Sequence, residues 1–224
     1  MNNHLDHYCE RILPRLWDEP FNVLTNIAFL LVAFLLFRKL RTLSSSSVNN
    51  SLDLWILIGL VTAIGVGSAT WHLLAAGWAL WADRIPILLF ISFFLVSCLV
   101  RMVNLSITTS LVLLVIFHII NVFVQIHFPP PTLNGSVFYI PTFLFLITIT
   151  FLLGSHHSLP VKSNFLIASV IFAIAIIFRS IDLAVCDSIS IGTHFIWHLL
   201  IALTIYLLMT ALIHTSVINL NHET

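Results

Sequence analysis

Three histidines in this chain have the types and spacing of metal ligands. His194 and His198 are four residues apart, so on a helix they share one face and lie one turn apart. Two imidazoles at that spacing can hold one metal ion, and His72 from a second helix could complete a three-histidine site. Three protein ligands with a fourth position open to water are typical of catalytic zinc, which lowers the pKa of that water to about 7.

Two oxygen-bearing side chains near His72 could take part in the same chemistry. Asp83 follows His72 by eleven residues and could act as a general base or orient the water. Ser68 precedes His72 by one helical turn and could donate a hydrogen bond to a substrate carbonyl oxygen or to the developing oxyanion. Together the five residues predict a hydrolytic zinc site.

Each of these residues also has a simpler interpretation. A single His-x-x-x-His pair can occur in a helix that binds no metal. Gly65, Gly67 and Ser68 form a face of small residues that lets helices approach closely, so Ser68 could serve packing alone. Asp83 could form an ion pair with Arg84 at the membrane interface. The metal-site hypothesis therefore depends on the folded chain bringing the whole set together.

The amino-acid composition indicates the kind of fold that must bring the candidate site residues together. The chain has 224 residues, of which 59% are hydrophobic and only 8% charged, with a mean hydropathy of +1.07. A soluble domain carries about 25% charged residues. The sequence therefore predicts an all-α polytopic membrane protein. The net charge of zero offers no basic face for nucleic acid, and nothing in the sequence requires a protein partner.

Seven segments are long and apolar enough to cross a bilayer, which needs about 20 apolar residues in a helix. The predicted spans are 21–37, 52–74, 80–100, 107–126, 136–153, 165–181 and 192–212. Residues 1–20 are acidic and contain two prolines, so they are predicted to be an extramembrane segment rather than a signal peptide. The domain organisation is then 1–20 outside the bilayer, 21–214 as a seven-helix domain, and 215–224 as a short tail.

The number of spans and the loop charges predict where the chemistry lies. With seven spans, His72, Asp83, His194 and His198 all fall on the side of the N-terminus. Basic residues accumulate in cytoplasmic loops of membrane proteins. The loops on the side opposite to the N-terminus carry five of them, Arg38, Lys39, Arg41, Arg101 and Lys162. The sequence therefore predicts an N-terminus outside and a C-terminus in the cytoplasm.

The chemistry-bearing residues resemble the signature of the alkaline ceramidase family. This family belongs to a wider group of seven-helix membrane hydrolases that includes the adiponectin and progestin receptors. The matching residues are Ser68-x-x-x-His72, Asp83 followed by Pro86, His194-x-x-Trp197-His198, Tyr8-Cys9-Glu10 and Glu19-x-x-Asn22-x-x-Thr25-Asn26. The resemblance implies a zinc-dependent amidase that cuts the N-acyl bond of a sphingolipid, so its partner is a ceramide-like membrane lipid.

The same resemblance implies a calcium site at the N-terminus. Glu10 and Glu19 match two of the family's ligand positions. Two further ligand positions, an aspartate and an asparagine in the family, are occupied here by His7 and Ile12. Asp6 or Asp18 could substitute, because calcium takes oxygen ligands in a flexible geometry. The alternative is an acidic N-terminal segment that is simply solvated.

The chain has three cysteines, and two of them are predicted to pair. Cys98 falls inside the third span, where a thiol behaves as a small hydrophobic group. Cys9 and Cys186 both fall outside under the predicted orientation, in a setting that is oxidising if it is a periplasm or a lumen. The similarity of Cys9-Glu10 to the family's Cys-Glu favours a disulfide that holds the N-terminal segment over the metal site. Two unrelated thiols are the alternative.

Three other classes of membrane protein could share parts of this pattern. A receptor would keep the metal site but would favour a long cytoplasmic tail or loop. A haem carrier could use paired histidines from facing helices, but it would not need Ser68 and Asp83. A transporter would more often show inverted repeats or broken helices. The sequence therefore favours an intramembrane lipid hydrolase, with a receptor-like protein or a structural metal or haem site as the alternative.

Overall fold

The structure is a computed structural model, and it describes residues 8–13, 16–42, 51–129, 132–153 and 157–221, with backbone alone for 217–221. These residues form helices, and the described part of the chain contains no strand. The elements are α1 (Pro20–Thr25), α2 (Ile27–Thr42), α4 (Leu52–Leu74), α5 (Gly77–Arg101), α6 (Ile107–His127), η1 (Thr132–Tyr139), α7 (Ile140–Leu152), α8 (Leu159–Ile181), η2 (Asp182–Val185) and α9 (His194–Asn221).

Seven helical spans in the described residues are long and apolar enough to cross a membrane, which confirms the predicted fold class. The first span combines α1 and α2. Several helices extend beyond the predicted spans: α5 begins at Gly77, α8 begins at Leu159, and α9 continues past residue 214 to Asn221. Hydropathy detects only the hydrocarbon-spanning part of a helix, whereas the backbone stays helical through the polar interface.

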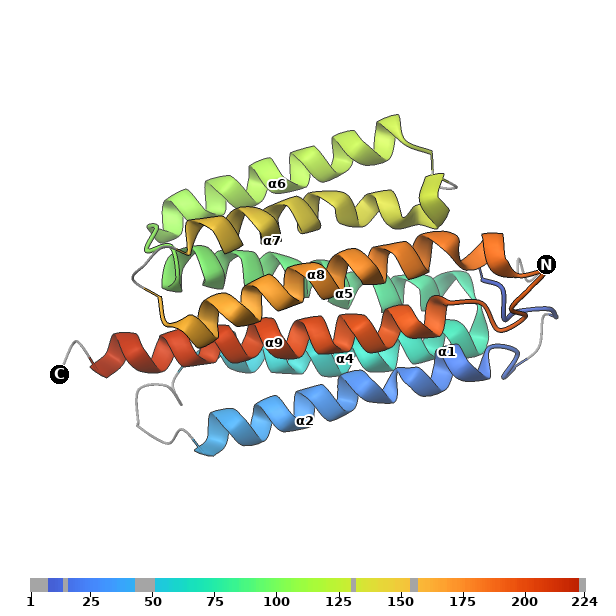
Figure 1. Cartoon of the computed structure of the whole chain (residues 1–224), viewed down its shortest axis with the longest axis horizontal. Helices are drawn as coiled ribbons and strands as arrows, with labels where there is room; N and C mark the ends of the chain where they lie inside the picture. Colours follow the sequence, from blue (N-terminus) through green and yellow to red (C-terminus); the bar gives the residue numbers. More distant parts are fainter. Residues whose placement is uncertain (1–7, 14–15, 43–50, 130–131, 154–156, 222–224) are drawn as a thin grey trace.

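The helices run side by side along the long axis of the molecule (Figure 1). In this view α6 and α7 form one edge, α2 forms the opposite edge, and α4, α5, α8 and α9 lie between them. The segment before α1 and the C-terminal end of α9 lie at opposite ends of the bundle. Large apolar side chains that are fully buried fill the space between these helices, among them Leu36, Leu54, Leu57, Ile149, Phe165, Met209, Leu212 and Ile213.

An ion pair ties α4 to α5 at the end of the bundle far from the N-terminal segment. Arg101, the last residue of α5, donates from Nε and Nη2 to the two carboxylate oxygens of Asp53, at 2.8 and 2.6 Å. Ser97 donates to the same carboxylate, and Arg101 also reaches Ser216 on α9. Because Asp53 lies in the first turn of α4, this fork-like pair fixes the register of the two helices at that end.

The α4–α5 hairpin is tight at the other end. Ala75 ends α4 in the left-handed conformation, with φ 45°, so that α5 can begin at Gly77. Pro86 has no N–H to donate to the carbonyl of Ala82, four residues earlier in α5. Gly67 of α4 packs against that carbonyl so closely that a Cβ atom there would overlap its oxygen. The next residue on each helix, Ser68 and Asp83, is thereby brought to the same place.

This close approach predicts a difference between two glycines of α4. Gly67→Ala should lower the free energy of unfolding by about 1–3 kcal/mol, because the added methyl group must push α5 away. Gly59→Ala is the matched control, since a Cβ at Gly59 would have no atom within 4 Å; its effect should stay within about 1 kcal/mol. Thermal unfolding of the purified proteins in detergent measures both. Equal midpoints for the two variants would contradict the close contact.

Candidate functional site

The three predicted metal ligands meet at the end of the bundle near the N-terminal segment. His72 lies in the last turn of α4, His194 begins α9, and His198 follows one turn later. Each is almost completely buried, with exposed fractions of 1–2%. One nitrogen from each ring lies within 4.8 Å of the others, so the three could hold a single ion. The site thus fits a metal in its donor set and in its burial.

Two of the three rings are held by hydrogen bonds at Nδ1. His72 Nδ1 bonds a carboxylate oxygen of Glu19, at 2.5 Å, and His198 Nδ1 lies 3.0 Å from the hydroxyl oxygen of Thr25. Thr25 already donates its hydroxyl hydrogen to the carbonyl of Phe21, so its oxygen accepts from His198. A ring that donates from Nδ1 keeps the lone pair of Nε2 for a metal. Glu19 and Thr25 therefore set the tautomer of both rings.

The third ring, His194, lies between an aromatic ring and a buried arginine. Tyr8 stacks on it with ring centroids 3.9 Å apart, and Nη1 of Arg179 lies 3.4 Å from its Nδ1. The guanidinium carbon of Arg179 also lies within 6 Å of the ring centroids of Tyr8, Tyr139 and Trp197. Arg179 was not among the predicted site residues, but the structure places it at the site. Its ring neighbours are scattered in the sequence, which gives no signal for this position.

A buried carboxylate fixes the start of α9 and hence the position of His194. Asp182 accepts hydrogen bonds from the backbone N–H groups of Thr193 and His194, at 2.6 and 2.9 Å, and from that of Cys9, at 3.1 Å. The chain can fold this tightly because Gly192 adopts φ 62°, and a Cβ atom there would overlap Asp182 and Cys9. Asp182 was not among the predicted site residues, because its partners are distant in the sequence.

The predicted disulfide joins the N-terminal segment to the connection between α8 and α9. Cys9 and Cys186 are bonded, with their Cα atoms 5.3 Å apart. Their separation of 177 residues means that the bond closes nearly the whole chain into one loop. Cys98 is a free, buried cysteine, as predicted. The N-terminal segment is therefore attached at Cys9 by both a covalent bond and the carboxylate of Asp182.

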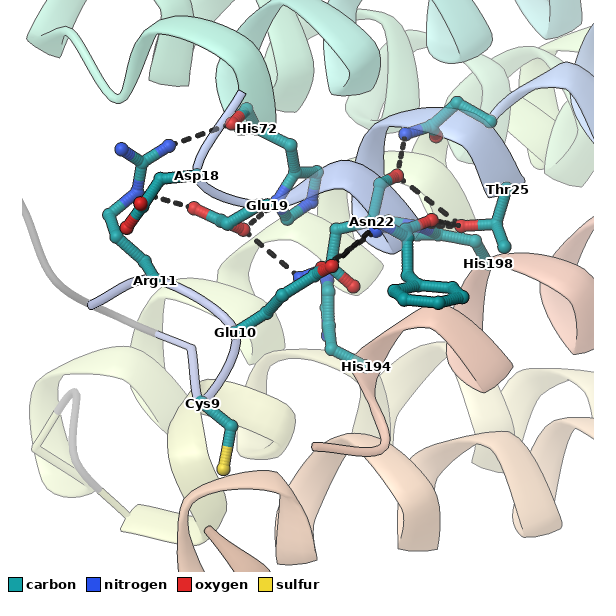
Figure 2. Close-up of polar contacts among 12 residues, drawn as sticks. Cys9, Glu10, Arg11, Asp18, Glu19, Asn22, Thr25, His72, His194 and His198 are labelled. Atoms are coloured by element: carbon teal, nitrogen blue, oxygen red, sulfur yellow. Dashed lines mark hydrogen bonds and ion pairs between the residues drawn. The ribbon is translucent and has the colours of Figure 1, made fainter. Parts of the chain in front are cut away.

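The two glutamates of the N-terminal segment bond the protein's own N–H groups (Figure 2). Glu10 accepts from the backbone amides of Phe21 and Asn22, at 2.6 and 2.9 Å, and so caps the start of α1. Glu19 accepts from Arg11 Nε, at 2.5 Å, from Asn22 Nδ2, at 3.0 Å, and from His72. In Figure 2 Glu19 lies between the arginine and the histidine. These contacts do not fit an open calcium site.

Burial acts on the pKa of three groups in this segment. It raises the pKa of Glu10, where two backbone N–H donors only partly oppose it. Burial also works against the charged form of Glu19, but the hydrogen bond from His72 and the charge of Arg11 outweigh it and lower the pKa of Glu19. The pKa of Tyr8 is raised by burial, although the nearby charge of Arg179 opposes the shift. Glu19 is therefore held as a carboxylate beside His72.

Ser68 and Asp83 lie with the three histidines on the wall of one cavity. The cavity has a volume of about 740 Å³, within the range of ligand sites. Both side chains line this cavity, and Asp83 is partly exposed whereas Ser68 is buried. From this polar end the cavity continues along α9 to Leu208, ten residues beyond His198, or about 15 Å of helix. The deep part is lined mainly by apolar side chains.

The fold and the site define a polytopic membrane protein with a buried three-histidine cluster at the polar end of an apolar cavity. The family model for ceramidase matches residues 7–224. The chain therefore belongs to the ceramidase family, as the motif resemblance predicted. No curated protein matches it.

The covalent attachment at Cys9 predicts a loss of stability when it is removed. Replacing both Cys9 and Cys186 by Ser should lower the free energy of unfolding by about 2–5 kcal/mol, because the unfolded chain gains freedom. Thermal unfolding measures the loss, and reduced wild-type protein is the control that keeps both sulfur atoms. Alkylation without reductant should label Cys98 alone after unfolding. Labelling of all three cysteines in the wild type would contradict the bond.

Proposed function

We propose that this protein is a zinc-dependent, ceramidase-like lipid amidase that hydrolyses the N-acyl bond of a sphingolipid to a fatty acid and a sphingoid base. The observation that carries the proposal is the meeting of His72, His194 and His198 with Asp83 and Ser68 at the polar end of an apolar cavity. Membership of the ceramidase family supplies the reaction class.

Zinc suits this donor set better than a hard cation does. Three neutral imidazole nitrogens are typical of zinc, whereas magnesium and calcium prefer oxygen ligands. A bound zinc ion would act as a Lewis acid and would lower the pKa of a coordinated water to about 7. His72, His194 and His198 would hold it, and Glu19 and Thr25 would keep two of the rings in the binding tautomer.

Asp83 is the proposed general base and acid. Its carboxylate is the acidic group of the cavity wall beside Ser68, and it can take a proton from the attacking water as oxygen adds to the amide carbon. When the carbon–nitrogen bond breaks, Asp83 returns this proton to the leaving amine. The Ser68 hydroxyl, beside Asp83, can donate to the substrate carbonyl oxygen as it becomes negative.

The substrate class follows from the shape and lining of the cavity. Its polar end holds the reactive groups and its deep end is apolar, which suits an amphipathic lipid whose amide lies at the histidines and whose acyl chain extends along α9. Such a lipid would enter sideways from the bilayer. Arg179 lines the polar end, and its Nε has no hydrogen-bond partner among the described residues. Its positive charge can hold the carboxylate of the released fatty acid.

The proposed orientation places the N-terminus and the site outside and the C-terminus in the cytoplasm. The Cys9–Cys186 disulfide supports it, because such bonds persist in oxidising compartments. The basic residues of the loops at the opposite end support the same orientation. The reaction would then draw on lipid of the outer or lumenal leaflet.

The function is tested by measuring zinc and turnover together. Wild-type protein should hold about one zinc ion per chain and should release fatty acid from ceramide. The variant Asp83→Asn should keep the zinc, but its turnover should fall by about 10²–10⁴-fold, because the amide of Asn cannot take up and return the proton. The double variant His194→Ala, His198→Ala should lose both. Elemental analysis and lipid mass spectrometry read the results. A wild-type protein that holds zinc but hydrolyses no N-acyl lipid would instead support a structural metal or a receptor-like role.

The orientation is tested with reporters fused at three positions. Fusions after Arg41 and after Lys162 should report the cytoplasm, whereas a fusion after Asn134 should report the outside, because loop charge sets the topology. Compartment-specific reporters such as alkaline phosphatase and green fluorescent protein give opposite signals at each position. The reverse pattern would place the site in the cytoplasmic half and change the leaflet that supplies the lipid.

A further inference from the structure

Arg11 is a buried cation at the outer side of the histidine cluster. Its exposed fraction is 5%, and its guanidinium bonds two groups at once: Nε donates to Glu19, at 2.5 Å, and Nη2 donates to the backbone carbonyl of His72, at 2.7 Å. Charged side chains are almost never buried unless they are paired. Figure 2 shows the guanidinium of Arg11 beside the last turn of α4, and Glu19 lies next to its Nε. Arg11 thus bridges the N-terminal segment and His72.

Arg11 bonds Glu19, one of the two residues that the family resemblance implies as calcium ligands. All four carboxylate oxygens of Glu10 and Glu19 already accept hydrogen bonds from N–H groups of the protein. Calcium takes 6–8 oxygen ligands, so it would have to displace several of these donors. It would also lie close to the guanidinium of Arg11, and two cations repel each other strongly in a buried site.

Among the described residues, neither Ile12 nor Asp18 supplies the missing calcium ligands. Ile12, which stands where the family has an asparagine ligand, has no side-chain oxygen and is 79% exposed. Asp18 directs its carboxylate to the backbone amides of Ile12 and Leu13, at 2.6 and 2.5 Å. Asp6 and His7 lie outside the described residues. The carboxylates that the described residues offer calcium at this position are therefore those of two glutamates that are already bonded.

We propose that Arg11 is a positioning residue that takes the place of calcium in this chain. Its guanidinium balances the charge of Glu19 and bonds the backbone carbonyl of His72. Through Glu19 it also orients the ring of His72. Arg11 would therefore position His72 in two ways. The bond to the carbonyl fixes the end of α4, and the bond to Glu19 keeps that carboxylate aligned with His72 Nδ1. Metal binding at His72 should consequently depend on Arg11 and should need no calcium.

The experiment uses full-length protein prepared in calcium-free buffer. Calcium is titrated to millimolar concentration while heat release and the midpoint of thermal unfolding are recorded; zinc affinity is measured separately by competition with a coloured chelator. Wild-type protein should release no binding heat and keep its midpoint. Arg11→Gln should weaken zinc binding about 10–100-fold, the usual effect of removing a group that orients a metal ligand. Arg11→Lys should fall between, because it keeps the charge but loses the planar fork.

Arg101→Gln is the matched control, because it removes a similar arginine–carboxylate pair, with Asp53, at the far end of the bundle. It should leave zinc affinity unchanged. A rise of the wild-type midpoint with calcium would overturn the proposal, and so would unchanged zinc affinity in Arg11→Gln. If Arg11→Gln does not fold, the zinc affinity of Arg11→Lys and the calcium titration of the wild type still test the proposal. The inference rests on the zinc site of the proposed function. Neither the calcium titration nor the zinc affinity measurement needs lipid, so the role of Arg11 can be refuted while the amidase activity is still found.

Discussion

The buried carboxylate of Glu19 is the contact on which the geometry of the site depends. Burying a charge without partners is very unfavourable, so this carboxylate is stable only where Arg11, Asn22 and His72 all donate to it. These donors come from the N-terminal segment, from the start of α1 and from the end of α4. Satisfying one charge therefore brings three separate parts of the chain to one point, and it orients one of the histidine rings there.

Asp182 does the same for the other half of the site. Its carboxylate accepts from Cys9, Thr193 and His194, and so joins the N-terminal segment to the first residues of α9. The disulfide at Cys9 and the left-handed turn at Gly192 make that junction compact. The histidines on α4 and α9 are thus held from the aqueous side by two buried carboxylates, whose common neighbour is the N-terminal segment.

This arrangement separates the polar chemistry from the apolar cavity. At the end of the bundle near the N-terminal segment, carboxylates accept hydrogen bonds from amides and from a guanidinium. Deeper in the bundle, apolar side chains of the helices line a cavity that continues along α9. An amphipathic lipid needs both environments, one for its amide and one for its chain. The rigid polar layer would let the reactive groups keep their positions while the apolar part adapts to different chains, as intramembrane hydrolysis requires.

The sequence by itself determined the seven spans and the shared side of His72, Asp83, His194 and His198, whereas it only favoured the pairing of Cys9 with Cys186, through the family resemblance. The spans and the shared side follow from local properties: apolar length sets the spans, an even number of crossings returns the chain to the side of the N-terminus, and helical periodicity sets the face that His194 and His198 share. Only the tertiary structure decided which partner each buried polar group meets. Nothing in the sequence indicated that Arg11 bonds Glu19 and the carbonyl of His72, or that Asp182 bonds Cys9 and the start of α9. Their contacts join residues up to 173 positions apart, and the choice among many potential partners is made by which groups must be desolvated together when the helices pack.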